Sequence, residues 1–170
     1  TIRDKYFDVE EENLVKIIKM LIKAGIDINQ EAKIIDMKIK PLDFALEGNS
    51  IDCIKYLVNS GAKVDYWSCT DWREHQGFHS PLLNFTPFRK NKKDEEEIFE
   101  TFKLIHEKGA ILELDENEFI APIDDTMVLP SPLNFNYQLL RKYDDEKTGN
   151  KKIVKYILEN SSKTKQNELY

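Results

Sequence analysis

The chain repeats one local pattern, in which a proline-leucine pair opens a helix and a chain-breaking residue closes a second helix further on. The pattern runs from Pro41-Leu42 to Gly61, from Pro81-Leu82 to Gly109 and from Pro132-Leu133 to Ser161, and a shortened first copy ends at Gly25. Proline suits the first position of a helix because its φ is already helical, and glycine accepts the left-handed backbone that ends one. A recurring unit buries its apolar face against its neighbours, so the sequence predicts a stacked array that presents surfaces.

The second copy shows the pattern most clearly, with Gly48-Asn49 between its two expected helices. Apolar residues three or four positions apart predict one helical stripe, and here they are Ile51, Ile54, Leu57 and Val58. The same columns recur ten, seven, four and three positions before the other terminators. They are Val15, Ile18, Leu21 and Ile22, then Phe99, Phe102, Ile105 and His106, then Lys151, Val154, Ile157 and Leu158. We interpret most of them as core, and His106 as a hydrogen-bonded histidine at a helix end.

These residues resemble the ankyrin-repeat family. The resemblance lies in Pro-Leu-x-x-Ala at the first helix, and in Gly25-Ile26-Asp27-Ile28-Asn29 and Gly61-Ala62-Lys63-Val64-Asp65 after the second helix. It implies an all-α solenoid of helix-turn-helix pairs that are linked by hairpin-like finger loops, and a protein-binding role. We therefore expect a single ankyrin-like domain over residues 1–170. Its approximate repeats are 1–35, 36–75, 76–125 and 126–170, with the first and last acting as caps.

The chain also departs from the family pattern. Where the family has a histidine after Pro-Leu, this chain has Asp43, Leu83 and Asn134, so the usual hydrogen-bond ladder between repeats is absent or rebuilt. The distance from each terminator to the next proline exceeds the family spacing, which predicts lengthened fingers. Further extra length in the third and fourth copies is expected in the turns between paired helices, around 89–97 and 141–152.

Composition narrows the class of protein. With 170 residues and a formal net charge of −6, the chain has enough length for one core and too little positive charge for nucleic acid. No apolar run approaches the roughly 20 residues of a membrane-spanning helix. Two cysteines favour a reducing, cytoplasmic compartment. Because the chain starts at Thr1 and not at methionine, a removed targeting peptide, and hence a secreted or translocated effector, stays open as an alternative.

The third finger is acidic. From Ile111 to Asp125 it carries acidic residues without lysine or arginine, namely Glu113, Asp115, Glu116, Glu118, Asp124 and Asp125. The inter-helix turn over 141–152 holds five basic residues against three acidic ones. Such a charge run is either a solvated face or an edge that steers a basic partner.

The second finger contains both tryptophans, Trp67 and Trp72. Aromatic side chains of this size are either interface anchors or cover for the neighbouring repeat. The same finger contains Cys69, His75 and His79, which as a soft ligand set are candidates for zinc. Their spacing matches no closed structural zinc site, so we expect no metal and no cofactor there.

The sequence thus favours a non-enzymatic, monomeric module that binds, and masks or inhibits, a basic protein, as antitoxin or immunity proteins and effectors do. Expected partner-binding residues lie on the fingers and first-helix starts: Asp36, Met37, Ile39, Glu47, Tyr66, Trp67, Trp72, Glu74, Phe78, Glu116, Glu118, Asp124 and Asp125. The alternative is a metal-binding or thiol enzyme centred on Cys69, His75 and His79. A structural segment of a longer array is a third reading. No partnership with nucleic acid or membrane is expected.

Overall fold

A computed structural model describes residues 11–34, 37–66, 68–70, 77–85, 92–113, 132–144 and 150–161. These residues are mostly helical, as the all-α prediction required, and their strands form two short hairpins. Among them, no helix combines the length and the apolar character that crossing a membrane demands. Contacts between Cα atoms group the chain into two compact units, Thr1–Lys63 and Val64–Tyr170. We call them unit 1 and unit 2; the single domain and its four repeats stay predictions.

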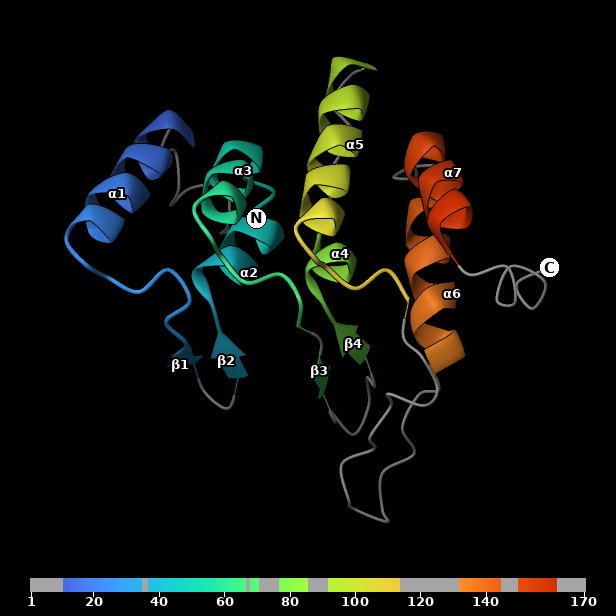
Figure 1. Ribbon diagram of the computed structural model, residues 1–170, viewed down its shortest axis with the longest axis horizontal. Helices are drawn as coiled ribbons and strands as arrows, with labels where there is room; N and C mark the ends of the chain where they lie inside the picture. The colour runs from blue at the N-terminus through green and yellow to red at the C-terminus, as the bar shows by residue number, and fades with distance from the viewer. Residues whose placement is uncertain are drawn as a thin grey trace, which may run out of the picture. The chain divides into compact units, whose positions relative to one another are not determined.

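Unit 1 combines three helices with one hairpin. In chain order its elements are α1 (Glu11–Lys23), β1 (Ala32–Ile34), β2 (Met37–Ile39), α2 (Pro41–Glu47) and α3 (Ile51–Asn59). Helix α3 packs against both α1 and α2, and β1 pairs antiparallel with β2 so that Ala32 lies opposite Ile39 (Figure 1). The apolar stripes of α2 and α3 supply the buried side chains Leu42, Ala45, Leu46, Cys53, Ile54, Leu57 and Val58.

Unit 2 combines a hairpin with two helix pairs. Its elements are β3 (Ser68–Thr70), β4 (Gly77–His79), α4 (Pro81–Asn84), α5 (Lys92–Glu107), α6 (Pro132–Tyr143) and α7 (Lys151–Asn160). Helix α4 contacts β4, α5 and α6, and α7 contacts α5 and α6 (Figure 1). The buried core of these helices is formed by Leu82, Phe85, Ile98, Phe102, Ile105, Leu139, Tyr143, Ile153 and Ile157.

The predicted helix starts are confirmed, because α2, α4 and α6 begin at Pro41, Pro81 and Pro132. The expected cap at Ser80 is also present, since its Oγ accepts a hydrogen bond of 3.2 Å from the Leu83 amide. The prediction of a long turn over 89–97 was wrong for residues 92–97, which form the first turns of α5. Glu95, Glu96 and Glu97 place negative charge in the first turns of this helix, near the positive end of its dipole, which favours helix formation there.

The glycine terminators have the same local structure. The φ angles of Gly25, Gly61 and Gly109 are 90°, 95° and 108°, in the left-handed region. Each glycine amide donates to the carbonyl three residues earlier, and the next amide donates to the carbonyl five residues before it. These two bonds form the Schellman motif that closes a helix. Ser161 instead has an extended backbone, with φ −80° and ψ 151°. The local structure therefore repeats at three of the four predicted terminators.

Polar side chains connect neighbouring copies of the pattern. In unit 1, Asn29 Oδ1 accepts a bond of 2.7 Å from the Lys63 amide, and Asn29 Nδ2 donates over 3.4 Å to the Gly61 carbonyl. In unit 2, the Tyr143 hydroxyl shares its proton between the carbonyls of Leu82 and Phe85, at 2.9 and 2.7 Å. Because α4 is only one turn long, its last carbonyls need donors from elsewhere, and Tyr143 of α6 supplies one to Leu82.

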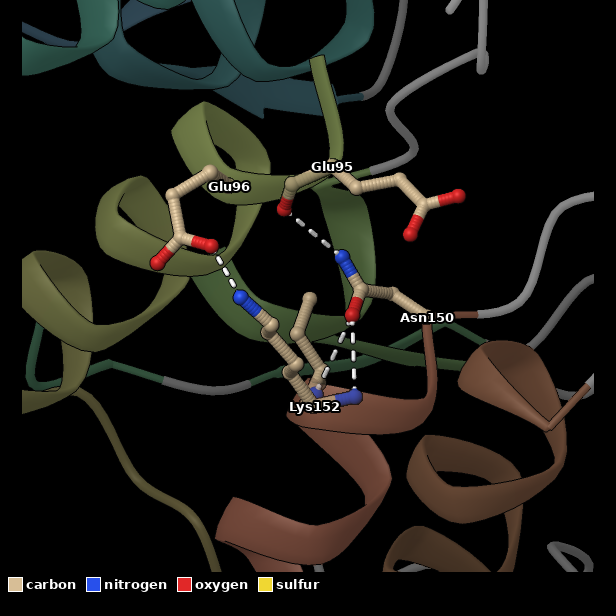
Figure 2. A network of polar contacts seen from close by, with 5 residues as sticks. Glu95, Glu96, Asn150 and Lys152 are labelled. Atoms are coloured by element: carbon tan, nitrogen blue, oxygen red, sulfur yellow. Dashed lines mark hydrogen bonds and ion pairs between the residues drawn. The ribbon is translucent and has the colours of Figure 1, made fainter. Parts of the chain in front are cut away.

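A second polar junction joins α5, α6 and α7 around Asn150 (Figure 2). Asn150 Oδ1 accepts from the amides of Lys152 and Ile153 at 3.0 and 3.4 Å, and its backbone amide donates to the Tyr143 carbonyl over 2.8 Å. Asn150 Nδ2 donates to the Glu95 carbonyl over 3.0 Å, and the Lys152 ammonium pairs with Glu96. The junction thus holds the starts of α5 and α7 together.

Candidate protein-binding surface

The outward face of α2 is one candidate surface in unit 1. Phe44 is 49% exposed, although Leu42, Ala45 and Leu46 on the same helix are buried. Glu47 is exposed and follows Phe44 by three residues, so the two side chains lie one turn apart on one face. We call Phe44 and Glu47 the α2 surface. A large aromatic ring beside a carboxylate suits contact with a protein that brings an apolar pocket and a basic group.

The hairpin β1–β2 fixes where α2 begins. Lys40 follows β2 directly, and its backbone amide donates to Asp43 Oδ2 over 2.8 Å. Asp43 is almost fully buried, so this bond closes the turn from the hairpin into the helix. A carboxylate in the first turn of a helix also interacts favourably with the positive end of the helix dipole. The Asp43 side chain thus binds the backbone directly before α2.

The structure describes only part of the predicted binding set. Ile39 is half-buried at the end of β2 and Glu47 is exposed on α2, both in unit 1. Tyr66 is half-buried in unit 2. Met37 and Phe78 are placed in β2 and β4 by their backbones alone. The other predicted contacts lie outside the described residues: Asp36, Trp67, Trp72, Glu74, Glu116, Glu118, Asp124 and Asp125.

Phe44 is a candidate contact residue that the sequence did not predict. A signal for it exists, because the buried residues Leu42, Ala45 and Leu46 have helical spacing and Phe44 lies off that stripe. An apolar residue off the stripe of a short amphipathic helix faces outward. The position of Phe44 off the stripe indicates a candidate surface only once the structure shows that its ring is exposed.

The alternative metal or thiol site is only partly described. The hairpin register sets Cys69 opposite Phe78 and His79 opposite Ser68, so Cys69 and His79 are not a cross-strand pair. His75 lies outside the described residues. Within the described part of the chain, no cluster of three or more His, Cys, Asp or Glu residues could hold a metal.

The titratable side chains with shifted pKa values lie inside unit 2. Burial lowers the pKa of Lys142 to about 7, and its ammonium nitrogen donates to the Leu83 carbonyl. Burial also lowers the pKa of His106, against an opposing effect of Glu107. His106 Nδ1 is 2.8 Å from the Tyr156 hydroxyl, which confirms the interpretation of His106 as a hydrogen-bonded histidine. Lys142 and His106 contact the backbone or side chains of neighbouring helices, so in this structure they link helices.

Two basic residues of the segment 141–152 are therefore engaged within unit 2. Lys142 binds the end of α4, and Lys152 pairs with Glu96. The predicted basic turn accordingly offers less free positive charge than its composition suggests.

Neither a protein-family model nor a curated protein matches this chain. The ankyrin resemblance and the binding role are therefore proposals that the sequence pattern and the local geometry have to support.

Proposed function

We propose that this chain is a non-enzymatic, ankyrin-like module that recognises another protein through its fingers and first-helix faces. The observation that carries the proposal is the α2 surface, where Phe44 stays half exposed beside Glu47 while its helical neighbours are buried. Leaving about half of a phenylalanine side chain in water forgoes about 1 kcal/mol of burial, which a partner surface would recover. The repeated Schellman caps and the two hairpins support the ankyrin-like arrangement.

The partner we propose is a basic protein, which the module masks or inhibits in the manner of an antitoxin or immunity protein, or captures as an effector. Support comes from the net charge of −6 and from the acidic run in the third finger, Ile111–Asp125. Carboxylates arranged along one loop attract a basic partner over a distance and raise the rate of encounter. In this arrangement Phe44 supplies short-range affinity and the acidic finger supplies steering.

Replacing Phe44 with alanine is expected to weaken partner capture about 30-fold, as the loss of a 2 kcal/mol hot spot would. The measurement is affinity capture from the native source with the immobilised chain, read by quantitative mass spectrometry, followed by titration of the recovered protein. Lys108→Glu, an exposed change in unit 2, is the matched control and should capture the same protein unchanged. Equal capture by Phe44→Ala and wild type would remove the α2 surface from the binding site.

Reversing the charge of Glu116, Asp124 and Asp125 together is expected to slow association with that protein at least tenfold at low salt. The dissociation rate should change little, because steering acts on the encounter. Stopped-flow or biosensor kinetics between about 20 and 500 mM salt would test this, with a shallower salt dependence in the variant. An association rate that the triple reversal leaves untouched would refute the steering role and leave the Phe44 contact standing.

A further inference from the structure

Tyr156 of α7 inserts into a socket on α5. Its ring meets those of Phe99, Phe102 and His106 edge to face, with centroids 5.9, 6.2 and 5.5 Å away. The three socket residues stand ten, seven and three positions before the terminator Gly109. Tyr156 stands five positions before its own terminator, Ser161, and we call that place the knob position. The knob of one copy of the pattern thus enters the socket of the preceding copy.

Unit 1 uses the same register. Tyr56 of α3 occupies the knob position, five residues before Gly61. The Lys19 ammonium nitrogen of α1 lies 5.2 Å from the centre of the Tyr56 ring. Lys19 lies on α1, the second helix of the preceding copy, six positions before Gly25. Lys103 has the same place on α5, six positions before Gly109, and its charge opposes the rise that burial causes in the pKa of Tyr156. Two separate pairs of neighbouring copies therefore pack by the same rule.

Helix α7 presents a socket of its own. Its socket positions are Lys151, Val154 and Leu158, and they line a hollow of ≈ 350 Å³. The wall of the hollow is completed by Asp144, Lys155 and Glu159. The match to α5 extends to charge, because Lys155–Glu159 and Lys103–Glu107 are ion pairs of 3.6 Å at equivalent positions. The hollow on α7 thus corresponds to the site on α5 that receives Tyr156.

Helix α1 presents an exposed knob. Met20 stands five positions before Gly25, where α3 and α7 have tyrosine, and it is 71% exposed. Ile17 and Leu21 beside it are 49% and 46% exposed, so an apolar ridge runs along this helix. Methionine is flexible enough to fill a socket that holds an aromatic ring elsewhere in the chain.

We infer that the chain associates head to tail with a second copy of itself, with Met20 of one copy entering the α7 hollow of the next. The register is the one that both internal contacts use. Charge does not oppose the arrangement, because the hollow carries both signs, with Asp144 and Glu159 beside Lys151 and Lys155. On the ridge side, Lys16 pairs with Glu12 and Lys23 adds a second lysine to the same edge. If α1 instead paired antiparallel with α1 of a second copy, the lysines along this edge of the two copies would face one another and repel. The inference does not depend on the proposed function.

Such an interface is heterologous, because each copy contributes a different surface. Each copy contributes one helix face, so the buried area of this interface is at the small end of the range for specific protein interfaces. We therefore expect dissociation constants on the order of 100 µM. The sequence-based expectation of a monomer would then hold at low concentration only. Knob and hollow both stay available at the ends of a dimer, so assembly can continue beyond two copies.

The test is sedimentation of the full chain from about 10 µM to about 1 mM, the range that brackets this affinity. The weight-average mass should rise from the 20.0 kDa of one chain toward at least twice that value. Met20→Glu and Val154→Glu should each stay at the mass of one chain, since the first loses the knob and the second loses the hollow. Lys108→Glu, which changes exposed charge elsewhere, should associate as wild type does.

Mixing the two defective variants separates this arrangement from any other. The intact knob of Val154→Glu fits the intact hollow of Met20→Glu, so an equimolar mixture should form a 1:1 pair and nothing larger. Far-ultraviolet circular dichroism checks that both variants fold, and Val154→Lys replaces Val154→Glu if that variant loses helix. A wild type that stays at one chain mass throughout, a Met20→Glu variant that still associates, or a mixture without the pair would each overturn the inference.

Discussion

Replacing Asn150 with alanine is expected to lower the free energy of unfolding by about 2 kcal/mol. The side chain is 3% exposed and binds α5 and α7 at once (Figure 2). Loss of the cap on α7 costs about 1 kcal/mol. Because Glu95 lies inside α5, its carbonyl keeps its intrahelical bond, so loss of the bond from Asn150 Nδ2 costs about 1 kcal/mol more. Urea unfolding followed by circular dichroism measures the sum.

Two further variants divide the effect of Asn150 into its parts. Asn150→Ser keeps an oxygen that can cap α7 but is too short to reach Glu95, so we expect about half the loss. Lys152→Ala removes an ion pair with Glu96 in which both side chains are more than half exposed, and should cost under about 1 kcal/mol. Should Asn150→Ala cost no more than Lys152→Ala, the junction would not be a major source of stability.

The features that the sequence predicted well are those that single residues determine locally. Proline fixes its own φ and cannot donate an amide, so Pro41, Pro81 and Pro132 mark helix starts whatever surrounds them. Glycine at a left-handed position, as at Gly61 and Gly109, marks a helix end for an equally local reason. Apolar residues at helical spacing predicted the core positions Ile54, Leu57 and Val58 of α3, whereas Leu21, at the position of α1 that corresponds to Leu57, is 46% exposed.

The features that the sequence could not predict depend on segments brought together by folding. In the sequence, Asn150 is only a polar residue in an expected turn. Its role depends on the Glu95 carbonyl of α5, to which it donates a hydrogen bond in the folded protein. The exposure of Phe44 depends on which side of α2 its neighbours cover. Likewise, Tyr56 and Tyr156 are separated by 100 positions, and their common role is visible only from the helices that they contact. Tertiary packing decides all three.

Lys142 underlies the second large effect, because folding places its amine against the end of α4. The nitrogen donates to the Leu83 carbonyl and lies 6.0 Å from the centre of the Tyr143 ring. Burial disfavours the charged form, which lowers the pKa of Lys142 from 10.5 to about 7. The neutral amine can still donate to the carbonyl. The folded protein therefore binds this proton more weakly than the unfolded chain does.

Raising the pH from 7 to 9 is expected to raise the free energy of unfolding by about 2 kcal/mol. Between the pKa of about 7 in the folded protein and 10.5 in the unfolded chain, the unfolded state holds one more proton. Stability therefore increases with pH in this window, by up to about 1.4 kcal/mol per pH unit. The window avoids the other groups with shifted pKa values: His106, whose lowered pKa acts below 6.5, and Tyr143 and Tyr156, whose raised pKa values act above 10.

Lys142→Met is expected to abolish this slope, because methionine fills similar volume without a titrating group. Urea unfolding at pH 7, 8 and 9 measures it, and Lys155→Met on the exposed side of α7 is the matched control that should keep the slope. The comparison is of slopes and not of absolute stabilities, since Lys142→Met also withdraws a donor from the Leu83 carbonyl. A wild type whose stability is flat from pH 7 to 9 would mean that the amine stays charged in the folded state. The end of α4 would then be held by an ammonium ion rather than by a neutral donor.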